Sequence, residues 1–199
     1  MKPHVFNHLG RFIWISAILG VMAAGSASAK SAQEIDIEVN ATLEAFASQV
    51  KGGSEFLQKA KGVLVFPKVG KAGLVVGGAY GEGAMRIGGR TVDYYSTAAA
   101  SIGLQIGVQT RSEIVVFLAQ DVLDKFRASK GWEAGVDGSI AVVQWGAGED
   151  LGTVEIKDPI VAFIFGNKGL MANLSLEGSK YTKLNRTAAE KSPDETESK

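Results

Sequence analysis

The stretch Gly83-Ala84-Met85-Arg86-Ile87-Gly88-Gly89-Arg90-Thr91-Val92-Asp93-Tyr94-Tyr95 decides the fold class of this chain. Apolar and β-branched residues on both sides of its centre are typical of strands, and Gly88-Gly89 has the length and composition of a two-residue hairpin loop. Two strands joined by so short a loop must run antiparallel. We therefore expect an antiparallel sheet around this hairpin.

Further strand patterns precede and follow the hairpin, and glycine is frequent among them. Most of the 25 glycines lie between Gly62 and Gly178, which indicates strands that bend or approach one another closely. The stretches Val115–Leu118 and Ile160–Phe165 are apolar throughout and predict strands covered on both faces. Strands are also predicted at residues 62–66 (ending in a turn at Pro67), 73–80, 101–109, 113–118, 139–145, 153–157 and 170–176.

Helical patterns occur at Ser31 to about Val50, at Ser54 to Lys61 and at Gln120–Ala128. The first begins with a capping-box pair, Ser31 and Glu34. Its polar face is acidic, whereas helices that lie on membranes are usually rich in Lys and Arg. We therefore expect this helix to pack on the sheet, with insertion into a membrane as the alternative. Its apolar positions recur at helical spacing: Ile35, Val39, Leu43, Phe46 and Val50.

Helices do not alternate with the strands, so a parallel sheet is not expected. The predicted fold class is α+β: a curved, mainly antiparallel sheet or partial barrel with a packed N-terminal helix and one further helix. We expect one domain over residues 30–184. A polar stretch low in apolar residues, 185–199, predicts a disordered tail.

Residues 1–29 have the three parts of a secretory signal peptide. Lys2 and Arg11 give a positive start, residues 12–24 are apolar, and Ala27-Ser28-Ala29 is a small-x-small cleavage site. The apolar run is short for a membrane span, which needs about 20 residues, although an uncleaved anchor is the alternative. We expect export across the inner membrane and a periplasmic or envelope-associated location.

The composition excludes several kinds of chemistry. The chain has no Cys, and its two His residues, His4 and His8, lie in the predicted signal peptide. The mature chain therefore cannot build a Ser–His–Asp triad, a thiolate nucleophile or a His or Cys zinc site. Its charge is close to neutral, which argues against a nucleic-acid partner. We expect no catalytic site, no metal and no cofactor.

Two other motifs have structural explanations. The run Gly77-Gly78-Ala79-Tyr80-Gly81-Glu82-Gly83 leads into another strand, whereas a nucleotide-binding loop leads into a helix. Pairs of carboxylates could act as general acid and base without His. The turn at 146–152 contains acidic residues, but it offers fewer oxygen ligands than a calcium site needs. The acidic pairs are Asp121/Asp124, Glu149/Asp150 and Glu155/Asp158.

Basic residues gather around the first predicted strands. If these strands are neighbours in the sheet, their cations form one rim that suits anionic lipid head groups. Phe56 and Leu57 would then supply exposed apolar contacts beside the rim. The alternative is an ordinary solvated face. The six cations are Lys59, Lys61, Lys68, Lys71, Arg86 and Arg90.

Two long blocks resemble the SYLF domain, a family also described as a yeast-type actin-binding domain. They are Ala60-Lys61-Gly62-Val63-Leu64-Val65-Phe66-Pro67-Lys68-Val69-Gly70-Lys71-Ala72-Gly73 and Val76-Gly77-Gly78-Ala79-Tyr80-Gly81-Glu82-Gly83. Tyr94-Tyr95-Ser96 and the ranges 101–109 and 169–179 are similar to the later blocks of the family. The resemblance covers about residues 33–184.

The resemblance implies membrane lipid binding. Eukaryotic members bind phosphoinositides through an amphipathic N-terminal helix and basic residues, and some bind and bundle actin. This chain differs in its acidic N-terminal helix and in its signal peptide, which would place it away from cytoplasmic phosphoinositides and actin. The implied ligands are bacterial membrane phospholipids or other anionic amphiphiles.

Three classes of function remain open. The first is a non-enzymatic module that binds anionic phospholipid in the bacterial cell envelope. The second is a protein-interaction or scaffold module, actin-binding-like by family name only, with a protein partner. The third is an enzyme that uses carboxylates.

Overall fold

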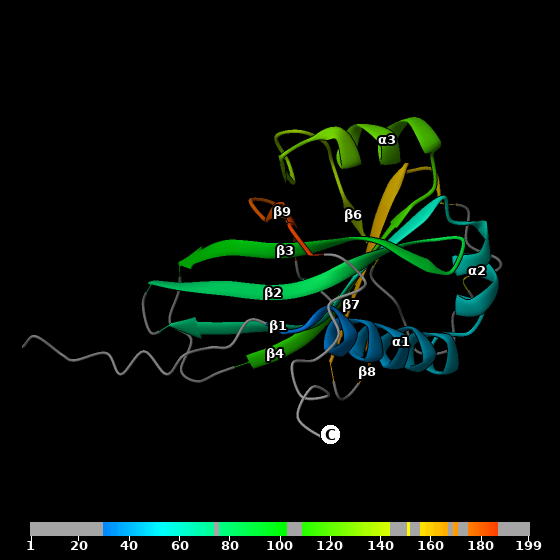
Figure 1. Cartoon of the computed structure of the whole chain (residues 1–199), viewed down its shortest axis with the longest axis horizontal. Coiled ribbons are helices and arrows are strands. Elements are labelled where there is room, and N and C mark those ends of the chain that lie inside the picture. The colour runs from blue at the N-terminus through cyan, green and yellow to red at the C-terminus, as the bar shows by residue number, and fades with distance from the viewer. Residues whose placement is uncertain are drawn as a thin grey trace, which may run out of the picture.

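The computed structural model describes residues 30–73, 76–102, 109–143, 151, 156–166, 169–170 and 175–186. This part of the chain forms three helices and one nine-stranded sheet (Figure 1). The strand order is β5-β9-β3-β2-β1-β4-β7-β6, with β8 paired to β7. Every pairing is antiparallel except that of β6 with β7. The predicted α+β class, with a curved and mainly antiparallel sheet, is confirmed.

The described elements have the following bounds. The helices are α1 (Ala32–Gln49), α2 (Gly53–Lys59) and α3 (Gln120–Ala128). The strands are β1 (Gly62–Gly73), β2 (Val76–Ile87), β3 (Arg90–Ile102), β4 (Gln109–Phe117), β5 (Gly131–Glu133), β6 (Ala141–Val142), β7 (Ile160–Gly166), β8 (Gly169–Leu170) and β9 (Lys180–Leu184).

Helix α1 begins and packs as its sequence predicts. The Ser31 side chain accepts from the Glu34 amide while the Glu34 carboxylate accepts from the Ser31 amide, so both halves of the capping box form. Ile35, Val39 and Phe46 are buried, and α1 lies along one face of the sheet (Figure 1). The expected packing of this helix on the sheet is therefore confirmed.

The sheet separates two apolar layers because successive strand residues point to opposite faces. On the α1 side, Val63 and Val65 of β1 join Val116 of β4. On the other side, where α3 lies (Figure 1), Leu64 and Phe66 join Phe126 of α3. Residues 115–117 and 160–165 are buried throughout, as expected for strands covered on both faces.

The central strands are longer than the sequence predicts. Strand β1 continues through the expected turn at Pro67, and its register shifts between Val65 and Lys68. The missing N–H of proline is tolerated at such a bulge. Strand β2 is continuous over two stretches predicted as separate strands, and at Gly83 a Cβ would lie 1.9 Å from the Val65 carbonyl oxygen. Gly83 therefore permits close contact between β1 and β2, and the strand continues through it.

The hairpin expected at Gly88-Gly89 forms between β2 and β3. Ile87 faces Arg90, and both glycines have positive φ, 56° and 78°, as a two-residue loop of this kind requires. Strands β5 and β9 were not predicted, although they pair with each other at one edge of the sheet. The strands predicted at 153–157 and 170–176 are described only in part. Residues 156–157 of the first and 175–176 of the second are not in a strand, whereas Leu170 belongs to β8.

Several predicted segments lie outside the described residues: the signal peptide 1–29, residues 103–108 and 144–150, and residues 187–199 of the tail. The structure does describe Arg186, whose guanidinium binds the Glu82 carboxylate and the Lys30 carbonyl oxygen. The fold therefore includes a contact between the start of α1 and the end of β9. Across the described ranges, helices are too short or too polar to span a membrane.

Candidate functional site

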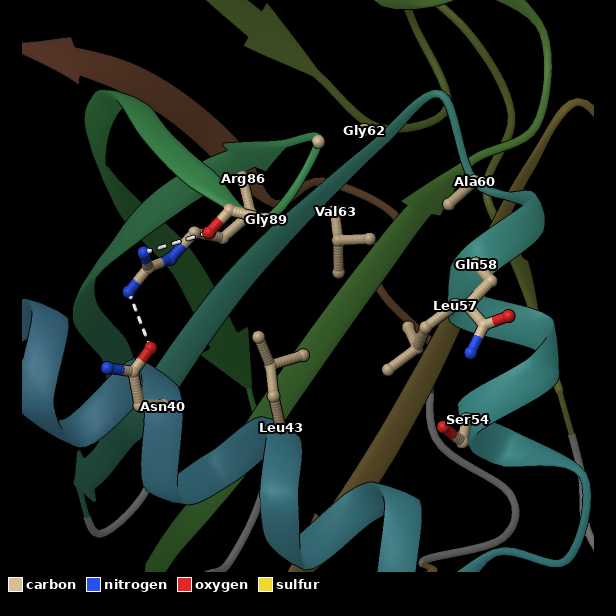
Figure 2. A pocket seen from close by; sticks show the side chains of 11 residues that line it. Asn40, Leu43, Ser54, Leu57, Gln58, Ala60, Gly62, Val63, Arg86 and Gly89 are labelled. Atoms are coloured by element: carbon tan, nitrogen blue, oxygen red, sulfur yellow. Dashed lines mark hydrogen bonds between the residues drawn. The ribbon is translucent and has the colours of Figure 1, made fainter.

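A pocket of about 540 Å³ lies where α1, α2, the start of β1 and the β2–β3 hairpin meet (Figure 2). Figure 2 shows the side chains of Leu43, Leu57 and Val63 converging from three different elements. The residues that line the pocket are Asn40, Leu43, Ser54, Leu57, Gln58, Ala60, Gly62, Val63, Arg86, Gly88 and Gly89. The pocket thus has an apolar interior with polar groups at its ends.

Helix α2 forms one wall through two adjacent residues that point in different directions. Phe56 is 7% exposed and packs edge-on against Phe163, with ring centroids 5.6 Å apart. Leu57 is one residue further on, about 100° around the helix, and lines the pocket. The expectation that Phe56 is an exposed apolar contact is wrong, because the short helix is anchored to the core by this ring. Leu57 is half-buried and remains accessible.

Arg86 forms the opposite wall, and it is held in place by α1 and the hairpin. Its Nη2 donates to Asn40 Oδ1 at 2.8 Å, and its Nη1 lies 3.5 Å from the Gly89 carbonyl oxygen (Figure 2). The same guanidinium lies 3.5 Å from Asp36 Oδ1, and its side chain is 13% exposed. Its Nε is buried without a hydrogen-bond partner in the described structure. Arg86 is therefore a fixed cation in a pocket wall, not a mobile surface group.

Three exposed cations are chain neighbours of residues that line the pocket. Lys59 and Lys61 flank Ala60, and Arg90 follows Gly89 directly. Because Ala60 and Gly89 line the pocket, the backbone of these three residues lies beside it, and we call them the rim cations. The structure therefore brings Lys59, Lys61, Arg86 and Arg90, four of the six cations singled out in the sequence, to one end of the domain.

The other two cations lie further along β1. Lys68 Nζ binds Glu38 Oε1 at 2.7 Å, although the Lys68 side chain is still 62% exposed. It lines a second hollow of about 400 Å³ on the other side of α1. The backbone of Lys71 pairs with Ala79 and Gln109, and its side chain lies outside the described part. The six cations expected to form a single rim are therefore divided, since Lys68 lies further along β1 than the four at the pocket end.

The acidic face of α1 binds the sheet. Asp36 accepts from Thr91 Oγ1 at 2.6 Å and from the Tyr94 hydroxyl at 2.9 Å. Burial, together with the hydrogen bond to Asp36, raises the pKa of Tyr94 to about 12. Burial also raises the pKa of Glu38, but hydrogen bonds from Lys30 and Lys68 outweigh it, and the net pKa lies below its ordinary value. These acids neutralise Arg86 and Lys68 in part.

One ionic pair lies inside the curled sheet. Arg111 Nε donates to Glu113 Oε1 at 2.8 Å, and the Glu113 side chain is 1% exposed. Glu113 Oε2 and the Tyr181 hydroxyl are buried without hydrogen-bond partners in the described structure. Burial raises the pKa of Glu113 despite the nearby Arg111 guanidinium. Glu113 therefore lies in the apolar interior, whereas Arg111 is 16% exposed and lines the hollow beside Lys68.

The acidic pairs considered for catalysis have ordinary surroundings where they are described. Asp121 lies 4.0 Å from Lys125 Nζ, and Asp124 accepts from Gln120 Nε2, all on the exposed surface of α3. Glu149, Asp150 and Glu155 lie outside the described residues. In the described ranges, no three acidic side chains converge to hold a metal ion.

Sequence reasoning missed part of the pocket. Leu43 was recognised only as a member of the α1 apolar stripe, and Asn40, Ser54 and Gln58 carried no signal because their roles depend on how α1 and α2 meet. The buried pair of Arg111 and Glu113 had a usable signal, since two opposite charges two residues apart in a strand share one face.

Comparison with known proteins gives one family match. Residues 98–190 match the Ysc84 family, described as "Las17-binding protein actin regulator". This range contains two of the later blocks that resemble the SYLF domain, 101–109 and 169–179, and its strands join those of the earlier blocks in one sheet. The resemblance drawn from the sequence is thereby confirmed. No curated protein matches the chain.

Proposed function

Since residues 98–190 match the Ysc84 (SYLF) family, we propose that the chain is a non-enzymatic module that binds anionic phospholipid in the bacterial cell envelope. The family description itself names a protein, Las17, and the regulation of actin. The proposal of a lipid ligand for this chain rests on the arrangement of its own residues.

The observation that carries the proposal is the coincidence of positive charge and accessible apolar surface at one end of the domain. Lys59, Lys61 and Arg90 are exposed around a pocket whose interior is formed by Leu43, Leu57 and Val63. Each cation near an anionic membrane contributes roughly 1 kcal/mol. Apolar contact beside the charges adds an attraction that salt does not screen.

The absence of an enzymatic role is part of the proposal. The predicted mature chain has no imidazole and no thiol, which leaves carboxylates as the ordinary acid–base groups. Asp121 and Asp124 are exposed and bound to neighbours on their own helix. The predicted signal peptide supports a periplasmic or envelope location, where the available amphiphiles are bacterial phospholipids.

Vesicle co-sedimentation of residues 30–199 tests the proposal. At low salt, we expect the protein to pellet with vesicles of phosphatidylglycerol and phosphatidylethanolamine and to stay in solution with vesicles of phosphatidylcholine alone. Binding should weaken as salt is added, because screening shortens the reach of exposed charges. Failure to pellet with the anionic vesicles at low salt would refute the proposal.

A protein-interaction module is the alternative, and the family description favours it because it names a protein partner. A stoichiometric complex with one envelope protein, insensitive to added phospholipid and present when vesicle binding is absent, would support this alternative. The two proposals therefore give opposite results in the same pair of experiments.

A further inference from the structure

We propose that the pocket between α1, α2 and the β2–β3 hairpin holds one acyl chain of an anionic amphiphile, whose head group is bound by Arg86 and the rim cations. The inference rests on the proposed function and makes it more specific. A module that only adheres to a membrane surface needs no cavity, whereas this one would bind a single lipid molecule in a defined place.

The apolar interior fits a hydrocarbon chain. Leu43, Leu57 and Val63 come from α1, α2 and β1 and face the same space (Figure 2). The volume of about 540 Å³ lies within the roughly 300–1,000 Å³ that is usual for small-molecule sites. Each methylene buried there raises the affinity about fourfold, so a chain of several methylenes would be bound firmly.

The charged end of the pocket fits an anionic head group. Arg86 is fixed by Asn40 and Asp36, so it loses little side-chain freedom when a ligand binds. Its Nε is buried, but the side chain is 13% exposed. A phosphate or carboxylate oxygen of the ligand at this wall would accept from the exposed part of the guanidinium. Asp36 neutralises part of the Arg86 charge, and Lys59, Lys61 and Arg90 supply further positive charge at this end of the domain.

The hairpin leaves this end of the pocket open. Gly88 and Gly89 both adopt positive φ, and a Cβ on either would meet nothing within 4 Å. The wall therefore consists of backbone with free space beside it, through which a head group can reach the rim. Other described hollows fit less well: the one beside Lys68 contains that cation already paired with Glu38, and the one over β2 and β3 is lined mainly by Gly and Ala.

The test is calorimetric titration of residues 30–199 with lauroyl-lysophosphatidylglycerol below its critical micelle concentration. We expect one-to-one binding, weaker for lauroyl-lysophosphatidylcholine because its head group carries no net charge. Leu57→Trp fills the pocket from a half-buried position and should lower the affinity about tenfold or more, the equivalent of two or more methylene contacts. Val136→Trp is the matched control, because Val136 is 74% exposed and outside the pocket lining.

The outcomes separate this inference from the function on which it rests. Vesicle pelleting without monomer binding, or equal monomer binding by wild type and Leu57→Trp, would refute the acyl-chain site and leave membrane adhesion intact. Absence of vesicle pelleting would refute the proposed function, whatever the monomer result. Circular dichroism shows whether each variant folds, and if Leu57→Trp does not, Leu57→Asn makes the wall polar and should lower the affinity in the same direction.

Discussion

Gly83 shows how one hydrogen in place of a side chain permits the central pairing of the sheet. A Cβ at this position would lie 1.9 Å from the Val65 carbonyl oxygen and 2.8 Å from a Phe66 ring carbon. Neither neighbour can retreat without moving β1, which is buried on both faces. The bulge at Pro67 and the absence of a side chain at Gly83 thus belong to the same close contact between β1 and β2.

We predict that Gly83→Ala lowers the free energy of unfolding by roughly 3 kcal/mol or prevents folding, as expected for overpacking against rigid backbone. Gly78→Ala is the control in the same strand, because its nearest contact, the Ala99 carbonyl oxygen, is at an ordinary 3.7 Å. That substitution should change stability by less than about 1 kcal/mol. Urea denaturation measures both, and equal effects would contradict the proposed contact.

Glu38 gives a prediction about pH. Its pKa is lower in the folded protein than its ordinary value of 4.5 because Lys30 and Lys68 donate to it. Between the folded pKa and 4.5, the unfolded chain therefore binds more protons than the folded protein. The stability that Glu38 contributes is complete above pH 4.5 and is lost as pH falls through the folded pKa. Glu38→Gln should cost about 0.5–1 kcal/mol at pH 7, and little below the folded pKa.

Urea denaturation of wild type and Glu38→Gln across the acid range checks this prediction. The difference between the two curves should shrink as pH falls, whereas a loss that is constant with pH would mean that packing, not charge, is responsible. Glu44→Gln, an exposed acid on the same helix, serves as the control and should behave like wild type.

At the level of elements, α1 is attached to the sheet by a polar seam as well as by its apolar stripe. Asp36 gathers Thr91, Tyr94 and Arg86 from β2 and β3. This seam explains why the helix is acidic where a membrane-inserting helix would be basic. It also fixes Arg86, so the same carboxylate that secures α1 positions the charged wall of the pocket.

We predict that Asp36→Asn destabilises the protein by about 2 kcal/mol, because charge-assisted hydrogen bonds are lost and Arg86 remains largely buried. The pKa of Tyr94, about 12 in the wild type, should fall but stay above 10, since burial is its largest cause. Thermal unfolding and ultraviolet titration of tyrosine check the two parts. An unchanged Tyr94 titration would contradict the contact.

Elements were predictable from sequence where local patterns decide them. The capping box and stripe of α1 and the Gly88-Gly89 hairpin form as expected because both depend on residues close together in the chain. The predicted breaks in β1 and β2 were wrong, because bulge and close strand contact depend on a neighbouring strand. Strands β5 and β9 are short, and within the described residues β5 pairs with β9 and β9 pairs with β3.

For the whole molecule, the sequence predicted a basic site but not its shape. Lys59, Lys61, Arg86 and Arg90 meet because β1 and β2 are neighbours, as assumed. Lys68 lies apart because β1 continues through Pro67. Phe56 is buried because its ring packs against Phe163 and attaches α2 to the core. The pocket itself could not be predicted, since it exists only where α1, α2 and the hairpin come together in space.

In the proposed function, the pocket end of the domain is the surface that meets anionic membranes. Reversing its three rim charges together, Lys59→Glu, Lys61→Glu and Arg90→Glu, tests this directly. The control reverses three other exposed lysines: Lys125 on α3, Lys130 shortly after it and Lys180 on β9. Both variants change the net charge by the same amount, so they differ only in where the charges lie.

The most direct measurement is therefore the affinity of wild type and these two variants for phosphatidylglycerol-containing vesicles at low salt, measured by flotation. We predict that the rim variant loses about a hundredfold or more in affinity, from roughly 1 kcal/mol for each cation removed, while the control keeps most of its binding. Unchanged binding by the rim variant, or an equal loss in both variants, would contradict the account.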